Sequence, residues 1–260
     1  MIIVCWLVCF LASVIGAICG IGGGVIIKPF LDALGIMDVA TISFLSGITV
    51  LSMTSYSLAK SVFFDKSKFQ KKIVLMLSFG GVVGGILGKW LFSFLKNLST
   101  KPDRIGAIQA SCLLVVTIAT LFYTVKKDKI KSKSIQNIGV CLSIGLVLGV
   151  LSSFLGIGGG PINLVVLFYF FSMPTKTAVE CSLCIIFFSQ IAALATTVIG
   201  QNLPDFSWKT LLVMVAGGIM GAVVGRKINK KIDSKMVEYL FIGLMVIIVF
   251  INIYNIYKFF

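Results

Sequence analysis

The sequence consists largely of apolar stretches with few or no charged residues, which recur from one end of the chain to the other. Each is roughly 20 residues long, the length that an α-helix needs to cross about 30 Å of hydrocarbon. They leave no room for a soluble domain. We expect eight membrane-spanning helices, at residues 2–19, 39–59, 73–95, 105–125, 134–155, 177–200, 210–225 and 239–257.

The composition excludes a water-soluble protein. Hydrophobic residues make up 58% of the 260 residues and charged residues only 12%, which is too little polar surface to cover a soluble globule. The first stretch lacks the basic leader and cleavage site of a secretory signal, so we expect it to remain as a helix. The chain is therefore predicted to be a multi-pass integral protein of the cell membrane, surrounded by the lipid bilayer.

The net charge of +14 does not indicate nucleic-acid binding. The lysines cluster in short loops between the apolar stretches, at residues 65–72, 126–133 and 226–235. Cytoplasmic loops of membrane proteins carry such an excess of basic residues. Membrane topology thus explains the charge, and no nucleic acid is expected as a partner.

The sequence offers no cluster of catalytic or metal-binding residues. It contains seven cysteines and no histidine, and histidine commonly joins cysteine in metal sites. Cys181 and Cys184 have the spacing of a redox pair, but a role as small apolar helix residues is favoured for all seven cysteines. Because the spans also lack paired acids, we expect neither an enzyme nor a bound cofactor or metal.

Two glycine-rich motifs each occur twice in the chain. The run GIGGG at residues 20–24 recurs 136 residues later, at 156–160. The motif GGVVGGILGK at residues 80–89 recurs 137 residues later as GGIMGAVVGR, at 217–226. This common spacing indicates a duplication. We predict an all-α fold, a polytopic transmembrane helical bundle of two homologous four-segment repeats with glycine-interrupted helices, at residues 1–130 and 131–260.

The loop charges favour repeats that enter the membrane from opposite sides. Residues 65–72 carry four basic residues and one acid, whereas the corresponding loop at 201–209 carries one of each. For the next pair of loops the order is reversed. Residues 97–104 carry two basic residues and one acid, and the corresponding residues 226–235 carry five basic residues and one acid. Because basic loops remain in the cytoplasm, this alternation predicts inverted repeats. Inverted repeats require that the segment after each glycine run returns to the side it came from without crossing the membrane. A parallel duplication with eight full spans fits the number of spans equally well.

Each glycine run is expected to end one helix and to start a short new one within the membrane. Glycine adopts tight backbone conformations that other residues avoid, and Pro161 suits the first turn of a helix. The free N–H groups and positive dipole end of the new helix would favour an anion. For a single run a kink or a packing site would be favoured, but two equivalent runs favour binding. The candidate substrate-binding residues are Gly20, Gly22, Gly23, Gly24, Lys28, Ser46, Thr49, Gly156, Gly158, Gly159, Gly160, Asn163, Ser182 and Gln190.

Three features near the runs have more than one interpretation. Lys28 could neutralise an anion at the first run, or it could anchor the helix by reaching lipid headgroups. The polar side chains could bind substrate or form ordinary contacts between helices. The small residues of the second motif, at 80–88 and 217–225, lie three and four apart and form a flat stripe, for which close helix packing is favoured.

The order of these motifs resembles the sulfite exporter TauE/SafE family of membrane transporters. The resemblance rests on the GIGGG runs and the two small-residue motifs, and it covers essentially the whole chain. It implies transport of sulfur-containing anions and small organic acids such as sulfite, sulfoacetate and related sulfonates. One departure is that the proline of the first half does not directly follow the glycines but lies at Pro29, after Lys28. The two half-sites need not be equivalent for this reason.

We therefore predict a secondary carrier or facilitator for small anions, sulfur-containing ones such as sulfite, thiosulfate or organosulfonates. The anion is expected near mid-membrane between the halves, held by N–H groups of both glycine runs, and the halves are expected to rock and expose it alternately. No Lys-Ser/Thr follows the glycines, so neither run is a nucleotide-binding loop. The alternative is a non-transporting membrane scaffold or assembly partner, which would not need two equivalent helix breaks.

Overall fold

The computed structural model describes residues 2–61, 71–98, 102–157, 159–201 and 203–259. Within these residues the chain is helical and contains no strand, as the sequence predicts. The helices in chain order are α1 (Ile2–Cys19), α2 (Gly24–Leu34), α3 (Val39–Lys60), α4 (Lys71–Leu98), α5 (Pro102–Lys126), η2 (Lys127–Lys129), α6 (Ile138–Leu155), α7 (Pro161–Phe171), α8 (Thr175–Ile199), α9 (Trp208–Lys231) and α10 (Ser234–Phe259).

The predicted spans are confirmed over the described part of the chain. Eight helices, all except α2, α7 and η2, are long and apolar enough to cross a membrane. Three bounds differ from expectation by four residues or more, one of them the start of α10, which lies at Ser234 and not at residue 239. The helix predicted from residue 134 begins at Ile138, because Lys133 and Ile135 instead donate backbone hydrogen bonds to carbonyls of α7. The helix predicted to end at residue 225 continues to Lys231, since basic residues favour a helix almost as well as apolar ones.

Local sequence signals set the helix ends around the two short helices. The Asn137 side chain caps α6 by accepting a hydrogen bond of 2.9 Å from the Gly139 N–H. Gly35 and Gly156 end α2 and α6 in the left-handed conformation that glycine adopts readily. Pro161 occupies the first turn of α7, where its missing N–H costs nothing. Glycine and proline therefore interrupt the apolar sequence at defined points.

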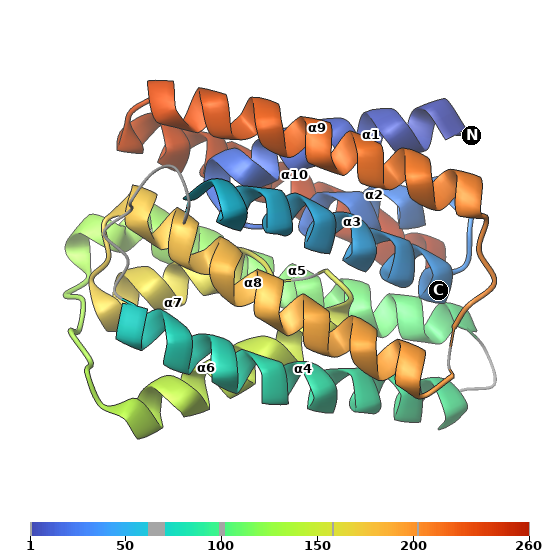
Figure 1. Cartoon of the computed structure of the whole chain (residues 1–260), viewed down its shortest axis with the longest axis horizontal. Helices are drawn as coiled ribbons and strands as arrows, with labels where there is room; N and C mark the ends of the chain where they lie inside the picture. The colour runs from blue at the N-terminus through green and yellow to red at the C-terminus, as the bar shows by residue number, and fades with distance from the viewer. Residues whose placement is uncertain (1, 62–70, 99–101, 158, 202, 260) are drawn as a thin grey trace.

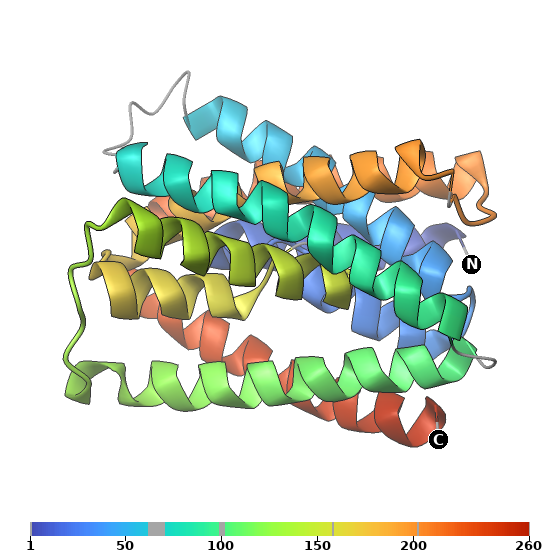
Figure 2. The same ribbon diagram turned by 90° about the horizontal axis from the view of Figure 1, so that it is seen from below.

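The long helices lie roughly side by side, and both termini lie at one end of the bundle (Figures 1 and 2). In Figure 1, α1 and α9 form one edge, α4 and α6 the opposite edge, and α3 and α8 cross between them, with α5 and α10 behind. The closest neighbours follow one pattern: α1 pairs with α9 as α6 pairs with α4, and α3 contacts α9 as α8 contacts α4. The most extensive helix contacts thus join residues before 130 to residues after it.

The two short helices run from the interior toward opposite ends of the bundle (Figures 1 and 2). α2 leads to the end that holds both termini, where α3 starts, and α7 leads to the other end, where α8 starts. The loop at 203–207 lies at the terminal end, whereas the basic segments at 127–133 and 226–235 lie at the opposite end. Helix α3 and helix α8 therefore run in opposite directions.

The stripes of small residues bring α4 and α9 against the backbones of α6 and α1. A Cβ atom at Gly84 would overlap the Leu146 carbonyl oxygen, and one at Gly221 would overlap the Phe10 carbonyl oxygen. This backbone-to-backbone contact needs residues without side chains, so the predicted packing role is confirmed. The glycines at these two interfaces, with the residue whose carbonyl each faces, are Gly80 with Leu142, Gly84 with Leu146, Gly88 with Val150, Gly217 with Trp6, Gly221 with Phe10 and Gly225 with Val14.

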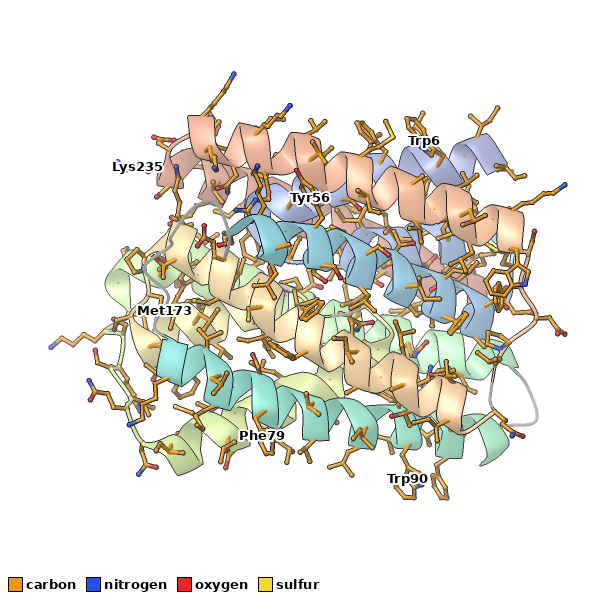
Figure 3. The ribbon with its side chains drawn as sticks, viewed as in Figure 1. Trp6, Tyr56, Phe79, Trp90, Met173 and Lys235 are labelled. Atoms are coloured by element: carbon orange, nitrogen blue, oxygen red, sulfur yellow. The ribbon has the colours of Figure 1, made fainter. Side chains whose placement is uncertain are left out.

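The outer surface of the bundle is apolar, as a lipid-facing surface has to be. Phe79 and Trp90 point outward from α4 and are 64% and 63% exposed, and Figure 3 shows Lys235 at the end of the bundle. The six cysteines other than Cys112 are buried, and none of the seven forms a disulfide. This arrangement supports the interpretation of cysteine as a small apolar residue.

We predict that Gly84→Ala destabilises the bundle. The added methyl group overlaps the Leu146 carbonyl, so α4 and α6 have to separate, and overpacking of this kind costs about 1–3 kcal/mol. Thermal unfolding of the purified protein in detergent is expected to show a lower midpoint. Gly243→Ala on α10 is the matched control, because nothing lies within 4 Å of its Cβ position. An equal loss of stability in both variants would contradict the prediction.

Candidate functional site

Each glycine run of the sequence forms a break between a long helix and a short one. α1 ends at Cys19 and α2 begins at Gly24, while α6 ends at Leu155 and α7 begins at Pro161. Both breaks are sharp because the backbone φ angle is positive, 75° at Gly20 and 65° at Gly156. Residues other than glycine rarely adopt such angles. Gly22 and Gly159 also have positive φ, and Gly158 lies outside the described residues.

The two breaks touch each other inside the bundle. A Cβ atom at Gly24 would overlap the Ile157 carbonyl oxygen, and one at Gly160 would lie 3.1 Å from Val25 Cγ2. Ile21, Val25 and Ile157 are almost completely buried. The two helix breaks, far apart in the sequence, are therefore one structural centre, which we call the paired break (residues 20–25, 156–157 and 159–161).

Each break packs against the long helix that follows the other break. A Cβ atom at Gly20 would lie 2.5 Å from the Val179 Cα of α8. Correspondingly, a Cβ atom at Gly156 would lie 2.7 Å from the Ser43 Oγ of α3. Since neither contact leaves room for a side chain, glycine is required at both positions. The first break thus faces an apolar residue of α8, and the second faces a hydroxyl group of α3.

Backbone N–H groups at the paired break lack acceptors within the described residues. Among the described residues, no backbone carbonyl accepts a hydrogen bond from the amides of Gly23, Gly24 and Val25 in the first break, or of Gly159 and Gly160 in the second. The first N–H groups of any helix are unpaired within the helix, but here they lie among buried residues. They are donors for an electronegative group, and the positive ends of two helix dipoles coincide with them.

Several buried polar side chains surround the paired break. Ser46 Oγ donates to the carbonyl oxygens of Ser43 at 3.2 Å and Gly156 at 3.4 Å. The hydroxyl groups of Ser43 and Ser182 and the Oδ1 atom of Asn163 are buried without a hydrogen-bond partner among the described residues. Buried polar atoms are rarely left unpaired. These atoms are therefore available to a bound solute.

Two of the predicted polar residues are engaged elsewhere. Thr49 donates its hydroxyl proton to the Leu45 carbonyl within α3, at 2.9 Å. Gln190 is buried on α8, with its Oε1 atom 3.1 Å from the Cβ position of Gly47. Thr49 therefore packs where α3 meets α9, since its Cγ2 atom lies 2.7 Å from the Cβ position of Gly218, and Gln190 packs where α8 meets α3.

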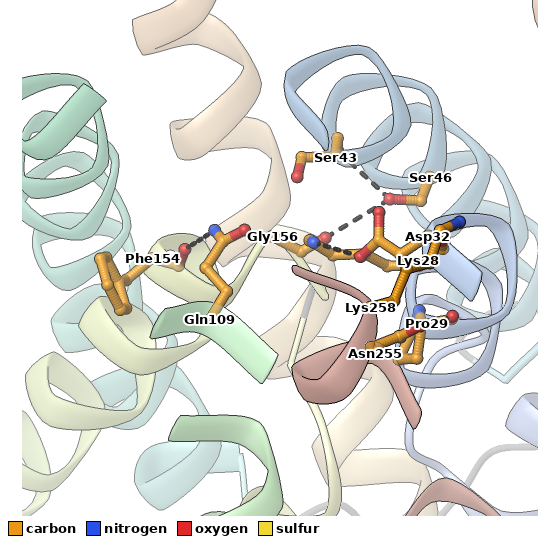
Figure 4. A network of polar contacts seen from close by, with 10 residues as sticks. All are labelled: Lys28, Pro29, Asp32, Ser43, Ser46, Gln109, Phe154, Gly156, Asn255 and Lys258. Carbon is orange, nitrogen blue, oxygen red and sulfur yellow. Dashed lines mark hydrogen bonds and ion pairs between the residues drawn. The ribbon is translucent and has the colours of Figure 1, made fainter. Parts of the chain in front are cut away.

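Lys28 does not reach the membrane surface. Its ammonium group forms an ion pair of 2.7 Å with Asp32, one turn further along α2, and the two side chains are 4% and 6% exposed. The interpretation as a headgroup anchor is therefore wrong. The Lys28 side chain instead lies at the second break, because its Cε atom is 3.4 Å from the Cβ position of Gly156 (Figure 4).

Sequence reasoning missed the polar residues that α5 and α10 bring to this centre. Gln109 Nε2 donates to the Phe154 carbonyl at 2.6 Å, in the last turn of α6 before the second break (Figure 4). Asn255 Nδ2 donates to the Pro29 carbonyl at 2.8 Å, and Lys258 donates to the Asp32 and Ala33 carbonyls at the end of α2. An isolated polar residue in an apolar stretch is the signal that could have identified Gln109 and Asn255.

An apolar hollow of about 480 Å³ lies away from the paired break, between α4, α6 and α8. Its lining includes Leu75 and Phe79, which are both largely exposed at the outer surface. The hollow has almost no polar atoms and therefore belongs to the lipid-facing surface.

A bundle of membrane-spanning helices with two broken helices meeting inside it is the architecture of polytopic membrane transporters, in which substrates bind at such breaks. The model of the sulfite exporter TauE/SafE family matches residues 5–251 of the chain. The chain therefore belongs to the TauE/SafE family of membrane transporters.

A curated relative has the same general function. The chain is 24% identical over 228 residues to the probable membrane transporter protein YunE of Bacillus subtilis (strain 168), and the match covers 81% of this chain and 82% of the relative. No solved structure matches the chain. The family and the relative support a membrane transporter.

We predict that Gly24→Ala disrupts the paired break. The new methyl group overlaps the Ile157 carbonyl oxygen, and a backbone atom cannot move aside as a flexible side chain can. We expect the free energy of unfolding to fall by about 1–3 kcal/mol, measured by thermal unfolding in detergent. Gly139→Ala is the control, since its Cβ position has only an ordinary contact of 3.4 Å with Asn137 Oδ1. Unchanged stability of Gly24→Ala would show that the two breaks are not in contact.

Proposed function

We propose that this transporter carries small anions, in particular sulfur-containing ones such as sulfite, thiosulfate and organosulfonates, and that it binds them at the paired break. The observation that carries the proposal is the contact of the two breaks at Gly24 and Ile157, with amide N–H groups on both sides that have no acceptor among the described residues. The name of the matched family supports the substrate class.

The chemistry of the paired break suits an oxyanion. Sulfite and sulfonates present three oxygen atoms that each accept hydrogen bonds, and backbone amides at two helix starts offer several donors from different directions. The hydroxyl groups of Ser43 and Ser182 and the Asn163 amide add further polar contacts. Because water is excluded from these buried groups, each charge-assisted hydrogen bond is stronger than at a surface.

Alternating access requires that the site opens to each side in turn. Helix α4 contacts both α6 and α8 extensively, and α9 contacts both α1 and α3, whereas α3 and α8 contact each other less than either contacts its partner α9 or α4. We propose that these two groups of helices rock against each other around the paired break. The moving units then differ from the sequence halves that the motif repeat suggests.

We predict that the purified protein in liposomes takes up at least one of sulfite, thiosulfate and a small sulfonate. Gly159→Val is expected to reduce this flux at least tenfold, because Gly159 has a φ of 111° and its side chain position overlaps Ile186. Gly243→Ala should transport normally, since its position is open. Correct membrane insertion of each variant is checked by size-exclusion chromatography in detergent.

Two outcomes would count against the anion proposal. Absence of flux for all three anions in the wild-type protein would favour a scaffold role over transport. Normal flux in Gly159→Val would remove the paired break from the binding site and leave it a packing role.

We also predict inverted repeats, with the basic loops in the cytoplasm. In a cysteine-free variant that retains transport, a membrane-impermeant thiol reagent should label Leu203→Cys from outside intact cells. Lys133→Cys should be labelled only after the membrane is opened, because the basic segment around it remains inside. Labelling of both positions from the same side would exclude the inverted arrangement.

A further inference from the structure

In the Lys28–Asp32 ion pair one positive charge balances one negative charge, and an anion that binds beside the pair adds a second negative charge. Both side chains are almost fully buried on α2, and the ammonium and carboxylate groups are 2.7 Å apart. The pair is neutral as a unit, and the Asp32 Oδ1 atom has no hydrogen-bond partner among the described residues. Charged side chains within a membrane are costly and are retained chiefly for function.

The ion pair also lies beside the paired break. The Cε atom of Lys28 is 3.4 Å from the Cβ position of Gly156, whose carbonyl accepts from Ser46 (Figure 4). An anion held at the breaks would therefore come close to the Lys28 ammonium group. It would then compete with Asp32 for the same positive charge.

Among the described residues, the helices packed against α2 bring one other ammonium group close to the ion pair, that of Lys258. α1 contributes the thiols of Cys5 and Cys9 but no charged residue, and α3 carries only Lys60, in its last turn. α10 contributes Lys258, whose ammonium group is held by the Asp32 and Ala33 backbone carbonyls at the end of α2. The other charged residues of α10, Lys235 and Glu238, lie in its first turns.

We propose that Asp32 is a proton-linked counter-ion, which makes anion transport by this protein proton-coupled. When an anion binds the Lys28 ammonium group, the Asp32 carboxylate leaves it and takes up one proton, so that no second negative charge remains buried. When the anion departs, Asp32 releases this proton and restores the ion pair. One proton thus crosses with each anion. This inference rests on the proposed function.

Asp32 lies toward the end of α2 that is remote from the paired break. Asp32 lies two residues before Leu34, the last residue of α2, whereas the first residue of α2 lies at the paired break. The corresponding positions of the second half, 136 residues later, are Leu164 and Phe168. The ion pair therefore belongs to the first half alone, and the coupling requires only one carboxylate.

Proteoliposomes with an imposed pH gradient test the proposal directly. The probes are radiolabelled methanesulfonate and thiosulfate, which stay ionised at the pH values used, and valinomycin with equal potassium on both sides holds the membrane potential at zero. Wild-type protein with acid outside should accumulate the anion up to about tenfold per pH unit, the limit for one proton per anion. Asp32→Asn should show no accumulation, although it should still exchange labelled for unlabelled anion at a measurable rate when the pH is equal on both sides.

Two further variants separate a titrating group from a structural one. Asp32→Glu keeps a carboxylate and should retain accumulation. Asp205→Asn removes an exposed acid from the loop before α9 and should behave as wild type. Accumulation by Asp32→Asn at the wild-type level would overturn the proposal, and so would loss of accumulation in Asp205→Asn to the same extent as in Asp32→Asn.

A measurement on the wild-type protein covers the case in which Asp32→Asn does not fold. Addition of saturating methanesulfonate to the protein in weakly buffered detergent, with a pH-sensitive dye, should remove about one proton per protein from solution. Absence of this proton uptake would overturn the coupling. The proposed function is tested separately, because it fails if the wild-type protein transports neither probe under any gradient. Transport that does not depend on the pH gradient would contradict only the coupling to protons.

Discussion

The backbone of a protein in hydrocarbon has to satisfy its own hydrogen bonds, because no water is present to do so. The rest of this structure depends on that constraint. Two breaks at Gly20 and Gly156 leave backbone amides without an acceptor in the described part of the chain, and such groups are tolerated only where other protein covers them. The long helices provide this cover, and the breaks touch at Gly24 and Ile157. A pair of interrupted helices therefore requires a bundle closed around it.

Two electrostatic features meet at this centre and have different properties. The helix starts carry fixed partial positive charge that no chemical event can remove. The Lys28–Asp32 pair, 2.7 Å long and buried, carries full charges that a proton or a competing anion can change. In the proposed mechanism, the backbone supplies the affinity for an anion and the ion pair determines what else has to move with it.

The sequence predicts the long helices because hydropathy and length alone define a span, and it predicts the stripe at Gly84 because small residues three and four apart form one face. It does not predict the contacts of Gly20 with Val179 or Gly156 with Ser43, since no periodic pattern links residues so far apart. Asp32 also escaped notice, although its spacing of four from Lys28 is the spacing of a helical ion pair.

The glycine stripes have a consequence for how the chain must be made. Gly84 seats α4 on α6, and Gly221 seats α9 on α1, so each stripe finds its partner in the opposite half. A polypeptide cut between α5 and α6 would yield two fragments, and each would present a bare backbone groove to lipid. During synthesis the first half therefore remains in the membrane without its packing partners until α6 and α9 have been inserted.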